Sequence, residues 1–219
     1  MATNPTGAGY RGFQRHGTAS QQFNAIEFLI RSIVSGIATA TLVQVKAVTN
    51  SGGVMPVGFV DILPLINQIN GDGNAVPHAV IYHCPYSRLQ GGANAVILDP
   101  QVGDIGVAVF ASRDASSVAA NKAQANQGSW RTHDMADGLY IGGMLNGTPT
   151  QYVQFNTGGI TILSPNTVTI KAPAIVLDGP VTTTSTIVAT GNVTGAGTSL
   201  HTHLHGGVSP GGSNTGVPV

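Results

Sequence analysis

Charged side chains are scarce in this sequence, and neither sign predominates. Asp, Glu, Lys and Arg together make up 8% of the 219 residues, and the nine basic residues balance the nine acidic ones. Proteins that bind nucleic acid generally carry an excess of Lys and Arg that neutralises phosphates. The composition therefore argues against nucleic acid as a partner, and it provides no polybasic membrane anchor.

Cysteine is almost absent as well. Cys84 is the only one, so no disulfide can form within the chain, and durability has to come from packing, oligomerisation or a metal. Nothing near Cys84 in the sequence is suited to activating its thiol. We therefore expect Cys84 to be a small buried apolar residue rather than a reactive one.

Long uninterrupted apolar runs are missing too. Residues 1–22 contain no apolar core of signal-peptide length. The best run, "FNAIEFLIRSIVSGIATATLVQV" at residues 23–45, is interrupted by Glu27 and Arg31. Its apolar residues follow helical spacing, which predicts an amphipathic helix that stops at Gly36. We expect the apolar face of this helix to pack on a neighbouring sheet, rather than to span or coat a membrane.

Glycine and proline, by contrast, are plentiful, with 30 and 12 residues. Together with many Val, Thr, Ile and Asn residues they are typical of β-structure with many turns. Strands are predicted in "TATLVQVKAVTN", "VMPVGFVDILPLI", "AVPHAVIYH" and "GDIGVAVFAS". Four or five strands beside one helix fit a small Greek-key barrel such as an OB-fold, at residues 20–112 after an N-terminal arm at 1–19. Basic grooves and stacked aromatics are largely lacking, so we expect a structural role for this barrel.

Residues 113–150 form a connector that holds a large share of the charge. Its polar candidates are Arg113, Asp114, Arg131, His133, Asp134 and Asp137. His133 beside Asp134 suggests an acid–base dyad, but adjacent residues rarely present their side chains to each other. We therefore expect a polar clamp within or between subunits, and a short helix between Ala115 and Ala125.

Residues 151–198 are repetitive. Apolar anchors follow at intervals of eight, seven and then six residues: Ile160, Val168, Ile175, Val181, Ile187 and Val193. Short alternating segments that end in Gly, Pro, Asn or Ser are typical of stacked strands with tight corners. Units this short bury one face and leave their edges unpaired, a problem that three chains winding about one axis would solve. We therefore predict a trimeric β-helix; the alternative is a single-chain β-sandwich, whose turns would be spaced more widely.

Residues 199–219 form the expected apex, which contains three of the seven histidines. In a strand, alternate residues share a face, so an extended "LHTHLH" would place His201, His203 and His205 together. Two such histidines from each of three chains would surround one point on the threefold axis with imidazoles. Six nitrogens suit an octahedral transition metal, iron or a neighbour in the series, better than zinc. No position would remain for substrate, so this metal would be structural.

The sequence "THLHGGVSPGGSNTGVP" resembles the apex motif of the central spike proteins of contractile phage tails. "GDIGVAVFASRD" and "RTHDMADGLYIGG" are similar to the closing strand and connector of that family's OB-fold domain. The resemblance spans nearly the whole chain. It implies a homotrimer in the virion, at the tip of the tail baseplate, that binds one iron ion through His203 and His205 of each subunit. His201 departs from this pair, and either adds a second layer on the axis or faces solvent.

The same resemblance implies two kinds of partner besides the other subunits. The OB-fold end attaches to hub proteins of the baseplate, and the needle-like tip perforates the host outer membrane when the tail sheath contracts. In this role the energy comes from the sheath, so no nucleotide site is needed, and the sequence contains no P-loop pattern.

Other classes of function fit the sequence less well. A cell-wall glycosidase needs paired carboxylates, and the only glutamate, Glu27, lies in the predicted helix. A zinc hydrolase needs an open metal position and a nearby general base, but the last acidic residue, Asp178, lies far before the histidines. We therefore predict no enzyme. A trimeric receptor-binding fibre or adhesin is the stronger alternative, but its tip would carry aromatic residues, and residues 199–219 have none.

Overall fold

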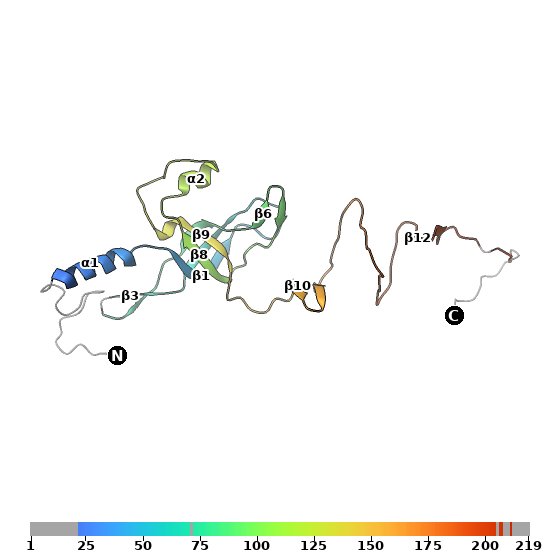
Figure 1. Cartoon of the computed structure of the whole chain (residues 1–219), viewed down its shortest axis with the longest axis horizontal. Coiled ribbons are helices and arrows are strands. Elements are labelled where there is room, and N and C mark those ends of the chain that lie inside the picture. Colours follow the sequence, from blue (N-terminus) through green and yellow to red (C-terminus); the bar gives the residue numbers. More distant parts are fainter. Residues whose placement is uncertain (1–21, 71, 205, 208–210, 212–219) are drawn as a thin grey trace. The chain divides into compact units, whose positions relative to one another are not determined.

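The computed structural model describes residues 22–70, 72–204, 206–207 and 211 (Figure 1). The fold is mainly β, as the composition predicts, and the chain divides into two units, Met1–Ile162 and Leu163–Val219. The N-terminal arm expected at 1–19 lies outside the described residues. The finer domain boundaries expected at residues 112, 150 and 198 stay predictions.

Helix α1 (Gln22–Ser35) forms where the apolar spacing predicts it and ends just before Gly36. On its surface, Arg31 pairs with Glu27 one turn earlier, with 2.8 Å between Nε and Oε1. None of its residues is buried. The expectation that its apolar face packs on a neighbouring sheet is therefore wrong for the single chain. In the part of the chain that the structure describes, no helix is both long and apolar enough to cross a membrane.

Five strands form one antiparallel sheet in the order β5–β2–β1–β8–β9. They are β1 (Ala40–Val48), β2 (Phe59–Pro64), β5 (Ile81–Pro85), β8 (Ile105–Phe110) and β9 (Gly138–Gly143). The sheet curls until its edge strands meet. Tyr86, just after β5, bridges Tyr140 in β9, and the Ser87 amide donates a hydrogen bond to the Tyr140 carbonyl at 2.8 Å. A curled five-stranded sheet agrees with the strand pattern; its assignment as an OB-fold stays a prediction.

Bulges and one glycine make this curvature possible. The pairing of β1 with β2 shifts register between Val45 and Ala47, and such bulges bend a strand and increase its twist. Gly106 in β8 lies against β9, where an added Cβ would collide with the Gly142 carbonyl oxygen and the Tyr140 side chain. The close approach of β8 to β9 therefore requires a residue without a side chain.

Alternate side chains of the strands fill the inside of the curled sheet. Every second residue of β2 and of β8 is buried, as the alternating pattern predicts. The core consists of Val43, Val45, Val60, Ile62, Cys84, Tyr86, Ala108, Phe110 and Tyr140. Cys84 is 1% exposed, and burial raises the pKa of its thiol to about 11, which confirms it as a buried apolar residue. Because the strands supply this core themselves, α1 is not needed to cover it.

Short elements complete the first unit. Hairpins form between β3 (Gln68–Ile69) and β4 (Ala75–Val76), and between β6 (Leu89–Gly91) and β7 (Asn94–Val96). The strand expected over "AVPHAVIYH" is thus divided between β4 and β5. The expected connector helix is shorter than predicted: α2 (Ser116–Asn121) ends at Lys122, which adopts a left-handed φ of 51°. A 3-10 helix, η1 (Met135–Asp137), leads into β9.

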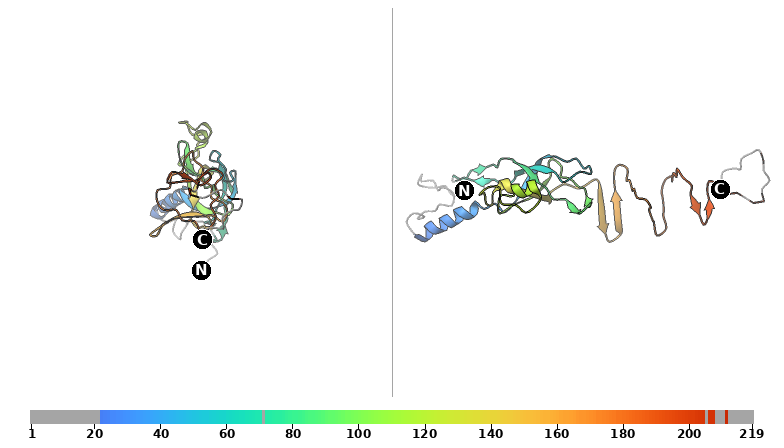
Figure 2. Two further views of the ribbon diagram at one scale, coloured as in Figure 1. Left: turned by 90° about the vertical axis from the view of Figure 1, so that its right-hand side faces the viewer. Right: turned by 90° about the horizontal axis from the view of Figure 1, so that it is seen from above.

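The expected shaft contains little regular structure in one chain. Strands β10 (Tyr152–Asn156) and β11 (Gly159–Leu163) lie side by side in opposite directions (Figure 2). Between Ser164 and Val193, where every residue is described, no strand forms. The last strands, β12 (Thr194–Gly195) and β13 (Thr198–Ser199), pair as a hairpin.

The apolar anchors of the shaft remain exposed. Their exposed fractions range from 44% at Val193 to 72% at Ile187. A β-sandwich within one chain would bury such residues, so that alternative does not describe the folded chain. The trimeric β-helix, in which the anchors would meet other chains, stays a prediction.

Candidate metal-binding apex

The apex begins with a tight hairpin. Thr194 pairs with Ser199 and Gly195 with Thr198, which leaves a two-residue turn at Ala196 and Gly197. Both turn residues have positive φ, 49° and 84°. This combination is typical of a type I′ turn, whose twist matches that of the strands it joins. Glycine adopts such a φ without strain, so the turn residue at Gly197 suits the position.

The Asn192 side chain accepts hydrogen bonds from the residues at the end of this hairpin and just after it. Its Oδ1 accepts hydrogen bonds from the Ser199 hydroxyl at 2.8 Å and from the His201 amide at 3.3 Å. The Leu200 amide donates to the Val193 carbonyl at 2.8 Å. One side chain nine residues before His201 thus holds the backbone from which the histidines project.

The segment from Leu200 to Leu204 turns, and does not form the strand on which alternate histidines would share a face. The Thr202 amide donates a hydrogen bond to the Ser199 hydroxyl at 3.0 Å, which draws the chain back toward the hairpin. The extended conformation considered for "LHTHLH" is therefore wrong at Leu200–Thr202. A shared face cannot be the reason for grouping His201 with His203.

His203 has a fixed ring orientation. Its Nδ1 lies 3.1 Å from the carbonyl oxygen of Leu200. A carbonyl oxygen can only accept, so Nδ1 is the donor in this contact, and in the neutral form of such a ring the lone pair lies on Nε2. Histidines that bind metals commonly donate their second ring N–H to a backbone carbonyl in this way. The donor chemistry of His203 therefore fits a metal ligand that binds through Nε2.

The other candidate ligands are less well defined by one chain. His205 lies outside the described residues, and His201 is exposed with its backbone amide bonded to Asn192. Among the described residues of a single chain, no three His, Cys, Asp or Glu side chains are grouped as a metal site. The expected site takes two histidines from each of three chains, so it would not be complete in any one of them.

The connector contains the expected polar clamp, within the chain. Arg131 Nη2 lies 3.1 Å from Asp114 Oδ2 and 3.2 Å from Asp137 Oδ1. The Ser129 hydroxyl also donates to Asp114 Oδ2, at 2.6 Å. Hydrogen bonds from Ser116 and Ser129, aided by the charge of Arg131, lower the pKa of Asp114 to about 2. Both carboxylates are buried, and through Arg131 the clamp joins the start of the connector to η1, directly before β9.

His133 and Asp134 have separate structural roles. The Asp134 carboxylate accepts a hydrogen bond from the Ala136 amide at 2.8 Å and thereby caps η1. His133 adopts a positive φ of 51°, and its carbonyl accepts from the Ala38 amide at 3.0 Å. These contacts support a clamp rather than an acid–base dyad.

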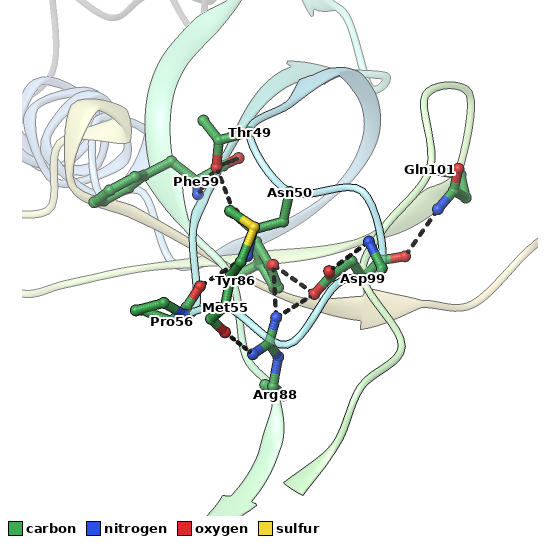
Figure 3. Close-up of polar contacts among 10 residues, drawn as sticks. Thr49, Asn50, Met55, Pro56, Phe59, Tyr86, Arg88, Asp99 and Gln101 are labelled. Carbon is green, nitrogen blue, oxygen red and sulfur yellow. Dashed lines mark hydrogen bonds and ion pairs between the residues drawn. The ribbon is translucent and has the colours of Figure 1, made fainter.

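A second buried ion pair was missed by sequence reasoning. Arg88 and Asp99 are 3% and 0% exposed, and Arg88 Nη2 lies 2.5 Å from Asp99 Oδ1 (Figure 3). The Tyr86 hydroxyl donates to the same oxygen at 2.6 Å, and the Gly52 amide to Oδ2 at 3.0 Å. Burial opposes ionisation of Asp99, but these hydrogen bonds outweigh it and lower the pKa of the carboxyl.

This network ties a loop to a hairpin. Arg88 Nη1 also donates to the Met55 carbonyl at 2.6 Å, so the pair joins the β1–β2 loop to the base of the β6–β7 hairpin (Figure 3). A signal existed in the sequence, since Arg88 and Asp99 are isolated opposite charges on either side of the turn "GGAN". Because both side chains are buried, the network stabilises the fold and offers no surface for catalysis.

Comparison with known proteins identifies the apex. Residues 197–219 match the family model described as the GpV Apex motif, a segment that includes His201, His203 and His205. None of the curated proteins matches the chain. The motif fits the tip of a phage central spike, and it indicates a structural component of a phage tail.

Proposed function

We propose that three copies of this chain form the central spike of a contractile phage tail, with one iron ion at the tip. His203 and His205 of each copy are its ligands. The observation that carries the proposal is the match of residues 197–219 to the apex motif, and the contact between His203 Nδ1 and the Leu200 carbonyl suits a ligand that binds through Nε2. The proposed place of the protein is the tail tip of the virion.

In this proposal each histidine contributes one ring nitrogen to the threefold axis. The Leu200 carbonyl would orient the ring of His203 and keep the proton on Nδ1, so that Nε2 would be its ligand atom. Asn192 and the Ala196–Gly197 turn set the position of the backbone that leads to it. A bound iron ion would supply coordination bonds that keep the three chain ends together.

The composition of residues 141–219 supports a shaft that enters a membrane. Lys171 and Asp178 are the only charged residues of this segment. Because few charges would have to enter hydrocarbon, the free-energy cost of passing through a membrane would be low. The exposed anchors from Ile160 to Val193 would gain burial if three chains wound around each other. In the assembled tail, the curled sheet would attach to the baseplate hub and the apex would perforate the host outer membrane.

The proposal is tested by metal content and oligomeric state together. We expect the full chain to sediment as a trimer with about one iron per three chains. His203→Ala and His205→Ala should lose the iron and remain trimeric. His78→Ala is the matched control, because His78 is a half-buried histidine of the first unit, far in sequence from the apex, that contacts the Ile66 carbonyl at 3.0 Å.

Two results would contradict the proposal. Iron retained in full by His203→Ala would exclude that residue as a ligand, and a monomeric chain would exclude the trimeric spike. His201→Ala decides the remaining question of the apex, since iron is lost only if His201 belongs to the coordinating layer.

A further inference from the structure

Helix α1 presents an apolar face that nothing in the described single chain covers. Seven side chains form this face, with exposed fractions between 40% and 76%. They are Phe23, Ile26, Leu29, Ile30, Ile33, Val34 and Ile37. An open groove runs along it, lined by Phe23, Ile26, Ile30 and Val34 together with the paired Glu27 and Arg31 and with Ser35. The core of the curled sheet contains no residue of α1, so the face is available to a partner.

The apolar residues of this face recur at regular intervals along the sequence. Phe23, Ile26, Ile30, Ile33 and Ile37 follow each other at alternating intervals of three and four residues. This is the a/d pattern of a coiled-coil heptad, and isoleucine at both a and d favours three or four strands over two. Ile37 follows the end of α1, and its amide bonds to the Val34 carbonyl three residues back, at 3.1 Å, so it lies in the turn that closes the helix.

The residues beside the seam agree with this packing. Leu29 and Val34 occupy the g and e positions that flank it, and they widen the apolar stripe. Glu27 pairs with Arg31 of the same helix, with 2.8 Å between the charged groups. Glu27 occupies the other e position beside the seam, but its charge is already paired within the helix, and the a and d positions carry no charge.

We propose that α1 of three copies packs in parallel along this seam and forms a second contact between the subunits. The inference rests on the proposed trimeric spike, and it concerns a surface far in sequence from the apex. If each of the seven side chains has an area of about 150–200 Å², their exposed fractions correspond to on the order of 700 Å² of apolar surface per helix. A standard interface buries roughly 800 Å² per partner, so the face is large enough for a stable contact.

A second copy is a better occupant than the preceding segment of the same chain. Met1, Tyr10 and Phe13 are the only large apolar residues in 1–21, too few to cover seven side chains. Another copy, by contrast, brings an identical stripe with the same a/d spacing. Charge gives no reason for a different protein, because the a and d positions are uncharged and Glu27 beside them is paired with Arg31 of its own helix.

Disulfide crosslinking tests this arrangement in the full chain. Ile26→Cys places a thiol on the seam, and Ser32→Cys places one on the opposite side of the same helix as the matched control. The native Cys84 thiol should form no crosslink, because Cys84 is 1% exposed and the pKa of its thiol is raised to about 11. Neither substitution alters the core of the curled sheet, because no residue of α1 is buried.

We expect mild oxidation to convert most Ile26→Cys protein into covalent dimers within the trimer, and to leave Ser32→Cys uncrosslinked. Disulfides need Cα atoms within about 7 Å. In an antiparallel pair, Ile26 would face Ile33 and lie about 10 Å from its counterpart, so crosslinking also reports the parallel direction.

The other outcomes overturn the inference. A trimer in which neither variant crosslinks would mean that residues 1–21 or a different protein covers the face, and the proposed spike would stand. Equal crosslinking of both variants would indicate random collisions. A monomeric chain would refute the helix contact and the proposed function together.

Discussion

Substitution of Asn192 by Ala should weaken metal binding although Asn192 is not itself a ligand. The change removes the oxygen that accepts hydrogen bonds from the Ser199 hydroxyl, at 2.8 Å, and the His201 amide, at 3.3 Å. Hydrogen bonds contribute about 0.5–1.5 kcal/mol each. Both bonds are exposed, so we take about 0.5 kcal/mol for each, the lower end of this range. The lost stabilisation is then about 1 kcal/mol per chain, or about 3 kcal/mol for the proposed trimer that shares one ion.

A difference of 1.4 kcal/mol corresponds to about a factor of ten in affinity, so the dissociation constant should rise about 100-fold. This lies at the upper end of the roughly 10- to 100-fold that is typical for loss of groups that orient metal ligands. Competition between the stripped protein and a chromogenic chelator for Fe²⁺ measures this constant. Asn192→Asp keeps the accepting oxygens and should bind nearly as tightly as the native chain.

Asn166→Ala is the control for a general effect on the second unit. The backbone amide of Asn166 bonds to the Ser164 hydroxyl at 3.2 Å, and the substitution leaves that amide in place. An unchanged dissociation constant for Asn192→Ala would refute the argument that this side chain positions the histidines. An equal loss in Asn166→Ala would refute it as well, because the effect would not be specific to the apex.

Two further predictions concern the first unit. Ile62→Ala should lower the free energy of unfolding by about 2–5 kcal/mol in urea titrations without changing metal content, because Ile62 is 0% exposed in the core. An unaltered midpoint would contradict that core. The pKa of Asp114 lies at about 2, below the roughly 3.9 of an unfolded Asp. Its stabilising effect is therefore complete above about pH 4 and is lost as the pH falls through about 2. Melting temperatures across this range should fall less steeply in Asp114→Asn, and parallel curves would exclude Asp114 as the cause.

The curled sheet could be predicted from sequence because its strands bury one face. The alternation in residues 59–64 and 105–110 reappears as alternate burial in β2 and β8. The closure between β5 and β9 could not be predicted, since it depends on bulges and on the space that Gly106 leaves. Periodicity reports which face of a strand is apolar, but it does not report how far a sheet bends.

Sequence spacing was less informative about contacts between side chains. The helical spacing correctly predicts α1, but an apolar face does not identify the surface that covers it. The pattern "LHTHLH" suits a strand, yet hydrogen bonds from the His201 and Thr202 amides to Asn192 and Ser199 stabilise a turn at Leu200–Thr202. The Arg88–Asp99 pair forms because a hairpin brings together residues that are eleven apart, a proximity that neither residue reveals alone.

The meeting of β5 and β9 also limits how the first unit can associate. Where Ser87 bonds to the Tyr140 and Ile141 carbonyls, the edges of the sheet are already engaged, so a neighbour can attach there through side chains and loops but not by adding a strand. Residues 164–193 form no strand of their own, so their backbone N–H and C=O groups are not used in a sheet within the chain. In the proposed trimer, the first unit would therefore contact other copies through side chains, as along α1, and the second would contact them through backbone pairing.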